Sequence, residues 1–319
     1  MRFRQLGSSG LTVSLVGLGC TNFGKRVDLD DTRAVVHAAL DAGINFFDTA
    51  DIYGGQGESE RLLGEVLGKS REDIVLATKF GADMGGAIEP GWAARGSRRY
   101  IPKAVEASLR RLRTDHIDLY QLHEPDPLTP IEETLSALAD LVRDGKVRYV
   151  GSSNLAAWQI ADAEWTARAG GLPRFISAQN EYNLLKRDVE ADVVPACERY
   201  GIGLLPYFPL SAGLLTGKYS RERPSSGRLA EPRYTPLLTD TALDRVDALK
   251  MFAEERGRSV LDVAIAGLAS QPGVSSVISG ATRPEQVLAN VAAGEWEPTE
   301  ADLVELDAVV PSRRPGATT

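Results

Sequence analysis

Eight short apolar runs, separated by amphipathic helical stretches, constrain the fold of this chain more than any other feature of its sequence. Most runs are continuously hydrophobic, which is typical of a parallel strand that is buried on both faces. Eight strand–helix alternations without a break in composition predict one α/β domain, a (β/α)8 TIM barrel, after a short N-terminal β-hairpin. We predict the barrel strands at Ser14–Leu18, Asn45–Phe47, Ile74–Thr78, Ile117–Leu122, Arg148–Gly151, Ile176–Gln179, Gly203–Leu205 and Ser276–Ser279.

The main alternative for an alternating chain is a doubly wound open sheet, which carries a Gly-x-Gly-x-x-Gly turn after an early strand. The nearest match is Gly17-Leu18-Gly19-Cys20, where the third glycine is missing. The barrel is therefore favoured, and we expect residues 1–319 to form a single domain. Within it, residues 217–239 are expected to be a lid loop, with a disordered insertion as the alternative. Residues 311–319 are expected to be a flexible tail.

The composition excludes several classes of protein. With 319 residues, 43% of them hydrophobic and 25% charged, the chain reads as an ordinary globular protein. Its formal net charge of −8 argues against a general nucleic-acid binder. No apolar run reaches the roughly 18 residues that a membrane span requires, and the N-terminus lacks the apolar core of a signal peptide. We therefore expect no membrane partner. Two cysteines are too few for a disulfide framework, so we also expect a cytoplasmic location.

Ionisable residues lie at the ends of three successive predicted strands, where barrel enzymes carry their chemistry. Asp48 follows the second strand, Lys79 the third and His123 the fourth, and Tyr53 lies on the loop after the second. We expect the four side chains to converge at one rim. The ammonium of Lys79 would lower the pKa of Tyr53, so that the phenol could act as a general acid or base. Asp48 would pair with Lys79, and His123 could donate a hydrogen bond to a carbonyl oxygen.

Taken one at a time, these residues are more often a helix cap, a packing residue or a solvated charge than part of a site. Their joint placement at successive strand ends favours the functional interpretation. A metal centre is the competing chemistry, but such a centre in a barrel needs several histidines and carboxylates at strand ends. Only one of the three histidines lies there, so no metal site is predicted.

The motifs around these residues resemble those of the aldo-keto reductase family, of the NADPH-dependent bacterial type, along nearly the whole chain. They are Asp-Thr-Ala-x-x-Tyr-Gly at 48–54, Ala-Thr-Lys at 77–79, Gln-x-His-x-x-Asp at 121–126 and Gly-Ser-Ser-Asn at 151–154. The resemblance implies a (β/α)8 barrel and a catalytic tetrad of Asp48, Tyr53, Lys79 and His123. It also implies reversible hydride transfer from NADPH to a small aldehyde or ketone, with Tyr53 protonating the oxygen. An NADPH-binding regulatory or interaction subunit with little turnover is the alternative.

The resemblance further implies which residues bind NADPH/NADP+. Ser152, Asn154 and Gln179 would hold the nicotinamide carboxamide, because amides and hydroxyls can both donate and accept. Tyr207 would stack on the nicotinamide ring, and Ser211–Lys218 would wrap the pyrophosphate. The full expected set is Gly19, Thr21, Asn22, Asp48, Ser152, Asn154, Gln179, Tyr207, Leu210, Ser211, Gly213, Leu215, Lys218, Gly280, Thr282, Arg283, Gln286 and Asn290.

The segment after the eighth strand has the pattern of an anion-binding site. A turn there leads into a helix N-terminus, and barrels often bind phosphate in the loops after strands seven and eight. By resemblance, Thr282 and Arg283 would take the 2′-phosphate of NADPH, with Gln286 and Asn290 at the adenine. The arginine suits this role because its guanidinium binds phosphate bidentately.

The substrate itself is not identified by the sequence. We expect an aromatic wall for the substrate pocket from Phe23, Phe80 and Trp92. Phe208 stands where many relatives have a serine, which adds an aromatic ring near the rim. The oligomeric state is left open.

Overall fold

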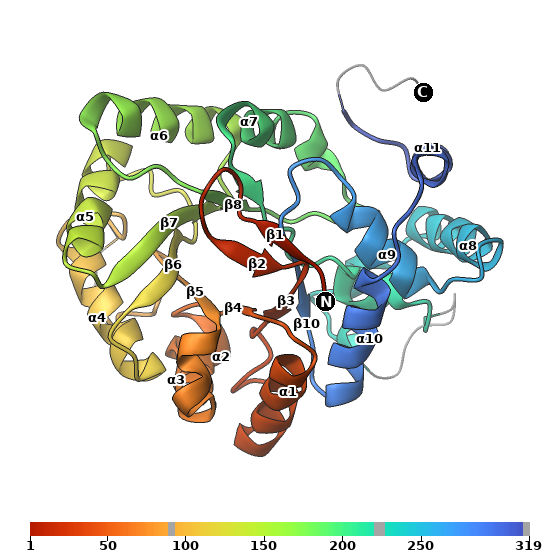
Figure 1. Ribbon diagram of the computed structural model, residues 1–319, viewed down its shortest axis with the longest axis horizontal. Helices are drawn as coiled ribbons and strands as arrows, with labels where there is room; N and C mark the ends of the chain where they lie inside the picture. Colours follow the sequence, from red (N-terminus) through yellow and green to blue (C-terminus); the bar gives the residue numbers. More distant parts are fainter. Residues whose placement is uncertain (89–92, 220–226, 315–319) are drawn as a thin grey trace.

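The computed structural model describes residues 1–88, 93–219 and 227–314. A two-stranded antiparallel hairpin comes first, and eight parallel strands then form the barrel with neighbours in chain order (Figure 1). The (β/α)8 prediction and the N-terminal hairpin are thereby confirmed. The hairpin strands are β1 (Phe3–Gln5) and β2 (Thr12–Ser14); the barrel strands are β3 (Val16–Gly19), β4 (Phe46–Asp48), β5 (Val75–Phe80), β6 (Ile117–Leu122), β7 (Val147–Ser153), β8 (Ser177–Gln179), β9 (Gly203–Leu204) and β10 (Val277–Gly280).

The ring of strands is closed between β9 and β10. The backbone N–H of Ser275 donates to the carbonyl oxygen of Leu204 at 2.9 Å, and the N–H of Ile278 donates to that of Pro206 at 3.0 Å. At the first strand the prediction needs a correction, because Ser14 belongs to the hairpin. Its N–H is bonded to the side chain of Asn45, and the barrel strand begins only at Val16.

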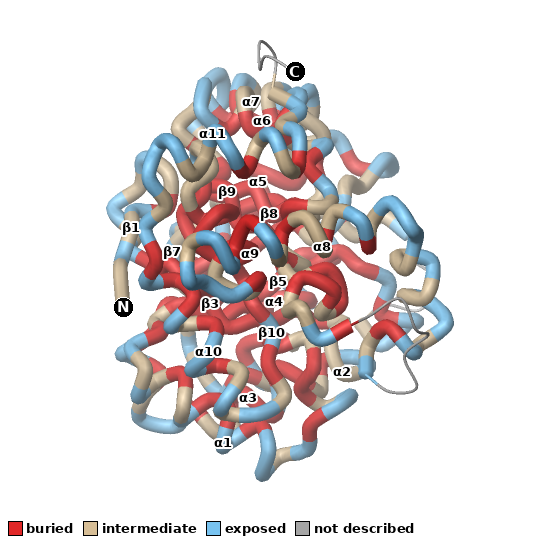
Figure 2. Tube along the Cα trace, turned by 90° about the vertical axis from the view of Figure 1, so that its right-hand side faces the viewer, coloured by how far each residue is buried: buried red, intermediate tan, exposed pale blue. Residues whose placement is uncertain are grey.

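Helices surround the barrel and bury its outer face (Figures 1 and 2). Most of them lie between consecutive barrel strands, as the crossovers between parallel neighbours require, while α10 and α11 follow the last strand. The helices are α1 (Leu29–Asp41), α2 (Tyr53–Gln56), α3 (Glu58–Leu67), α4 (Tyr100–Leu112), α5 (Ile131–Arg143), α6 (Ala157–Gly170), α7 (Val193–Tyr200), α8 (Asp240–Glu254), α9 (Val260–Ala269), α10 (Pro284–Gly294) and α11 (Glu300–Val309); the 3-10 turns are η1 (Gly68–Asp73), η2 (Asp188–Glu190), η3 (Ser211–Thr216), η4 (Arg228–Ala230) and η5 (Thr235–Leu237).

Side chains inside the barrel form a core of their own. Phe46, Val75 and Leu119 pack there against Leu6 and Val13 of the hairpin, which covers the N-terminal end of the barrel. Because side chains alternate along a strand, residues two positions after these also face the interior. The hairpin therefore fills one end of the barrel, and the polar residues of β4, β5 and β6 lie toward the other.

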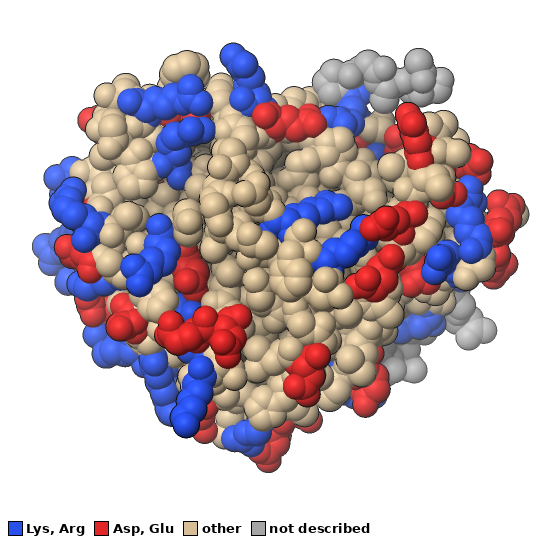
Figure 3. Space-filling model, in the orientation of Figure 1, with Lys and Arg blue, Asp and Glu red and all other residues tan. Residues whose placement is uncertain are grey.

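Charged side chains of both signs are spread over the surface (Figure 3). On the face that carries the hairpin, acidic and basic side chains are interspersed (Figure 3). Among the described residues, no helix is long and apolar enough to cross a lipid bilayer.

Candidate active site

The strand alternation brings three of the four expected catalytic side chains to the carboxyl end of the barrel interior. Asp48 lies two residues after Phe46 on β4, and Lys79 lies two residues after Ala77 on β5. His123 follows the last residue of β6, and its N–H donates to the carbonyl oxygen of Phe80 at 2.8 Å. The fourth, Tyr53, begins the short helix α2 after β4. All four side chains therefore lie at the carboxyl-end rim of the barrel, where the sequence predicted them to converge.

Lys79 lies at the centre of the group. Its Nζ donates to Oδ2 of Asp48 at 2.6 Å, to the backbone oxygen of Thr49 at 2.9 Å and to the hydroxyl of Tyr53 at 3.4 Å. The side chain of Lys79 is 0% exposed and that of Asp48 is 3% exposed, so this ion pair is held away from water. Burial alone would lower the pKa of Lys79, but Asp48 and Tyr53 raise it above its ordinary value. The ammonium therefore stays charged beside the phenol.

The expected effect of Lys79 on Tyr53 needs a correction. Removal of the phenol from water raises the pKa of Tyr53, and Lys79 opposes this rise without overcoming it. The sequence indicated the ammonium but could not show how far the surrounding chain keeps water from the half-buried phenol. Tyr53 consequently holds its proton at neutral pH, which is the state required of a proton donor.

His123 packs edge-on against Tyr53, with ring centroids 5.8 Å apart and an interplanar angle of 84°. Burial, reinforced by the charge of Lys79, lowers the pKa of His123 to about 3. The imidazole is therefore neutral at physiological pH. It can donate one N–H to a ligand oxygen without adding charge to the site.

Two amides hold the second oxygen of Asp48. Gln121 Nε2 donates to Asp48 Oδ1 at 3.2 Å, and Gln179 Nε2 donates to the same oxygen at 2.9 Å. The carboxylate thus has donors on both oxygens. The expected role of Gln179 did not include this contact, and Gln121 was not among the expected site residues.

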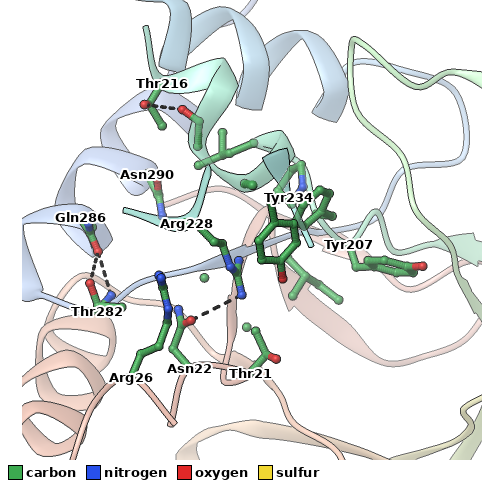
Figure 4. Close-up of a pocket in the computed structure, with 18 of the residues that line it drawn as sticks. Thr21, Asn22, Arg26, Tyr207, Thr216, Arg228, Tyr234, Thr282, Gln286 and Asn290 are labelled. Carbon is green, nitrogen blue, oxygen red and sulfur yellow. Dashed lines mark hydrogen bonds between the residues drawn. The ribbon is translucent and has the colours of Figure 1, made fainter. Parts of the chain in front are cut away.

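A cavity of about 1040 Å³ opens beside this group. Most of the residues expected to bind NADPH line it. The lining residues of that set are Gly19, Thr21, Asn22, Asp48, Gln179, Tyr207, Leu210, Gly213, Lys218, Gly280, Thr282, Arg283, Gln286 and Asn290. They come from β3, β4, β8, β10 and α10 and from the loops after β3, β9 and β10. Figure 4 shows the labelled residues of this set between Tyr207 and the N-terminus of α10.

Four expected cofactor residues are not among those that line the cavity. Ser152, Ser211 and Leu215 are buried, with at most 5% of the side chain exposed. Asn154 supports the site from behind, because its Oδ1 accepts from the hydroxyl of Tyr207 at 3.0 Å and its Nδ2 donates to the backbone oxygen of His123 at 3.0 Å. It links the candidate stacking residue to the tetrad.

The wall of the cavity also contains residues that the sequence did not single out as a site. Arg228 lies across the opening, where its Nη2 donates to Oδ1 of Asn22 at 3.5 Å (Figure 4). Tyr234 stacks on Phe208 with ring centroids 5.7 Å apart, and Arg228 lies 5.3 Å from the centroid of Tyr234. Arg26 forms an ion pair with Glu231 of the expected lid. In the sequence, only the several arginines of residues 217–239 indicated that this segment could contribute to the wall of the cavity.

The expected substrate wall is corrected by the structure. Phe23 and Phe80 are 0% exposed and belong to the hydrophobic core between the strands and the helices. Phe80 stacks on Tyr120 there, with ring centroids 4.6 Å apart. Its position directly after Lys79 explains this, because consecutive strand residues face opposite sides. Trp92, the third member of the expected wall, lies outside the described residues.

The loop between Asp48 and Tyr53 carries a further buried acid, Asp51. Neither of its carboxylate oxygens has a hydrogen-bond partner. Burial, together with the charge of Glu60, raises the pKa of Asp51 well above its ordinary value, while Arg111 and Lys79 act in the opposite direction. The folded protein therefore retains a proton that an exposed aspartate would lose.

We expect Asp51→Asn to remove a pH dependence of stability. Between the unfolded pKa of about 3.9 and the higher folded pKa, the native state binds the extra proton, so wild-type stability falls as pH rises, by up to about 1.4 kcal/mol per pH unit. Asparagine does not titrate, so the slope should disappear. Denaturant unfolding from pH 4 to pH 9 measures the free energy of unfolding of the wild type and of Asp51→Asn. Equal slopes for the two would show that Asp51 ionises normally in the folded state.

The chemistry available to this site is proton transfer beside a large ligand. A neutral phenol next to a fixed ammonium can protonate an oxygen, and the neutral imidazole can hold that oxygen in place. Lysine and arginine side chains along the rest of the cavity suit an elongated anion. Among the described residues, no group of three or more histidine, cysteine or acidic side chains could hold a metal ion.

Comparison with known proteins agrees with this geometry. A sequence model described as the aldo/keto reductase family matches residues 15–311. A probable voltage-gated potassium channel subunit beta from Oryza sativa subsp. japonica is 38% identical, over 98% of each chain. An L-glyceraldehyde 3-phosphate reductase from Escherichia coli K12 is 36% identical over 92% of this chain and 87% of its own. A versiconal hemiacetal acetate reductase from Aspergillus parasiticus is 33% identical over 99% of each.

Proposed function

The chain belongs to the aldo/keto reductase family, an oxidoreductase family, and from this premise we propose that it transfers hydride from NADPH to an aldehyde or ketone. The observation that carries the proposal is the hydrogen-bonded series from Asp48 through Lys79 to Tyr53 beside a large cavity. Bound NADPH would supply the hydride. The same site would run the reverse reaction, from an alcohol to a carbonyl compound.

In the proposed mechanism, Tyr53 gives its proton to the carbonyl oxygen as negative charge develops there. Lys79 stabilises the resulting phenolate, and Asp48 keeps Lys79 charged and oriented. His123, neutral because its pKa is about 3, donates a hydrogen bond to the same carbonyl oxygen. The raised pKa of Tyr53 supports the reductive direction, since the phenol is protonated before substrate arrives.

The cavity has the chemistry that NADPH requires. Six cationic side chains line it, and three of them, Lys218, Arg228 and Arg283, could bind the phosphates. Arg283 precedes Pro284, the first residue of α10, so the 2′-phosphate would also meet a helix N-terminus. A Cβ at Gly280 would lie 3.3 Å from Asn22 Nδ2, so the glycine leaves room for the amide of Asn22 in the wall of the cavity.

We propose further that residues 227–239, which lie within the described part of the expected lid, close over the bound cofactor. Two contacts support this role: Arg228 with Asn22, and Glu231 with Arg26. Both join the segment to the loop after β3 on the opposite side of the cavity. A single domain and a cytoplasmic location are part of the same proposal.

Arg283→Ala tests the assignment of the 2′-phosphate. We expect the Kd for NADPH to rise about 10- to 100-fold, because a charge-assisted hydrogen bond of about 1.5–3 kcal/mol is lost. The Kd for NADH, which lacks this phosphate, should change by less than about threefold. Fluorescence titration with both cofactors measures the two constants. An equal loss for NADH would show that Arg283 does not bind the 2′-phosphate.

The second candidate function is that of an NADPH-binding regulatory subunit with little turnover. The relatives named as potassium channel beta subunits favour it. The complete set of Asp48, Tyr53, Lys79 and His123, of which Asp48 and Tyr53 line the cavity, favours the enzyme. Mixing the protein with NADPH and a panel of carbonyl compounds, including an activated aromatic aldehyde, separates the two. Cofactor absorbance at 340 nm should fall with several of them; no fall with any would favour the regulatory subunit.

A further inference from the structure

Gln121 occupies a position in the barrel interior that the neighbouring strands leave open for it. It pairs in register with Lys79 on β5 and with Gly151 on β7. A Cβ at Gly151 would lie 3.2 Å from Gln121 Cγ and 2.2 Å from Ser177 Oγ. The glycine therefore makes the space through which the amide of Gln121 reaches Asp48.

Gln121 helps to fix the orientation of Asp48 from the side opposite Lys79. Its Nε2 donates to Asp48 Oδ1 at 3.2 Å, and Gln121 is 0% exposed. Together with Gln179, it supplies the donors that a buried carboxylate oxygen needs to offset its desolvation cost. Gln121 thus helps to keep Oδ2 of Asp48 directed at Lys79, 2.6 Å away.

Gln121 also fixes the amide of Gln179. Gln179 Nε2 donates to Gln121 Oε1 at 3.4 Å as well as to Asp48 Oδ1 at 2.9 Å. With both N–H groups used in this way, Gln179 can offer only its carbonyl oxygen to a ligand in the cavity that it lines. A primary carboxamide, whose NH2 donates, matches that oxygen.

We propose that Gln121 is a positioning residue that fixes the Asp48 carboxylate and the Gln179 amide together, and so couples the carboxamide of the nicotinamide to the proton donor Tyr53. The coupling runs through Gln179, Asp48 and Lys79 by the hydrogen bonds described above. Gln121 is not among the residues that line the cavity, so it acts through its neighbours. This inference rests on the proposed reductase function.

Gln121→Met tests the role of Gln121 toward Tyr53 and Lys79. We expect kcat to fall about tenfold while the Kd for NADPH stays within about threefold, because one hydrogen bond to a charged group is lost outside the cavity. Asp48 raises the pKa of Lys79, so a less well-held carboxylate should also move the basic limb of the kcat–pH profile to lower pH. If the methionine variant folds poorly, Gln121→Leu, which also lacks the donated N–H and adds no charge, replaces it with the same expectations.

Tyr120→Phe is the matched control. Tyr120 precedes Gln121 on β6, is 0% exposed and has a hydroxyl without a hydrogen-bond partner. Its removal disturbs the same strand without touching Asp48. Turnover and the pH profile of this variant should equal those of the wild type.

A cofactor analogue tests the role of Gln121 toward Gln179 by binding alone. In the 3-acetylpyridine analogue of NADP+, a methyl group replaces the carboxamide NH2 and cannot donate to Gln179. We expect the wild type to bind the analogue about tenfold more weakly than NADP+. In Gln121→Met the N–H of Gln179 that Gln121 accepts from is released and can donate to the acetyl oxygen, so the ratio should shrink to about threefold or less.

The outcomes separate the inference from the function on which it rests. A wild type that reduces carbonyl compounds, with a methionine variant unchanged in kcat, pH profile and analogue ratio, would overturn the role of Gln121 alone. A wild type that turns over no carbonyl compound would overturn the proposed function. In that case the analogue ratio, which needs no turnover, still decides whether Gln121 orients Gln179.

Discussion

Tyr53→Phe is expected to lower kcat for carbonyl reduction by about 10²- to 10⁴-fold, the range that a positioned general acid contributes. The phenylalanine ring fills the same space and keeps the edge-on contact with His123, so the change removes only the proton that the substrate oxygen receives. Lys79 would lose one of its three acceptors but keep Asp48 and Thr49. The charge arrangement around the cavity should therefore be nearly unchanged.

The affinity for NADPH should hardly change in Tyr53→Phe. Tyr53 is proposed to act on the substrate oxygen, so the Kd for NADPH should stay within a few-fold of the wild type. Steady-state kinetics and fluorescence titration on one preparation measure both quantities. Tyr100→Phe is the control, because Tyr100 is buried at the start of α4 and its hydroxyl has no hydrogen-bond partner. Turnover retained by Tyr53→Phe would refute the assigned role.

The barrel and the position of the tetrad were predictable because both depend on strand periodicity. Continuous apolar runs indicate strands buried on both faces, and the residue that ends each run must lie at the carboxyl rim. Asp48, Lys79 and His123 follow from that rule without knowledge of any loop. The same periodicity predicts that Phe80 faces outward, because it is the neighbour of the inward-facing Lys79 on the strand. Applied consistently, it would have removed Phe80 from the substrate wall.

Features that depend on burial or on distant loops were not predictable. The sequence indicated an ammonium near Tyr53, but the direction of the pKa shift depends on how much water the surrounding chain excludes. Arg228 and Asn22 lie 206 positions apart in the chain, and no periodic pattern relates them. Gln121 was quoted as part of a motif, yet its contact with Asp48 requires the barrel curvature and the space above Gly151.

Lys79→Met is expected to remove nearly all turnover and also to destabilise the fold, which distinguishes it from Tyr53→Phe. Without the ammonium, the phenolate formed after proton transfer loses its stabilising charge, so kcat should fall by at least as much as in Tyr53→Phe, about 10²- to 10⁴-fold. Asp48 would keep its two amide donors but lose its counter-charge in a buried place. Breaking such a pair by removing one partner typically costs about 3–5 kcal/mol of unfolding free energy.

A second substitution separates the two losses in Lys79→Met. In the double variant Asp48→Asn/Lys79→Met, no unpaired charge is left, so much of the lost unfolding free energy should return. Turnover should not return, because neither residue can support a phenolate at Tyr53. Denaturant unfolding and steady-state kinetics on wild type, both single variants and the double variant complete the cycle. If stability and turnover recovered together, Lys79 would be needed only to hold the fold, and the ammonium would have no part in proton transfer.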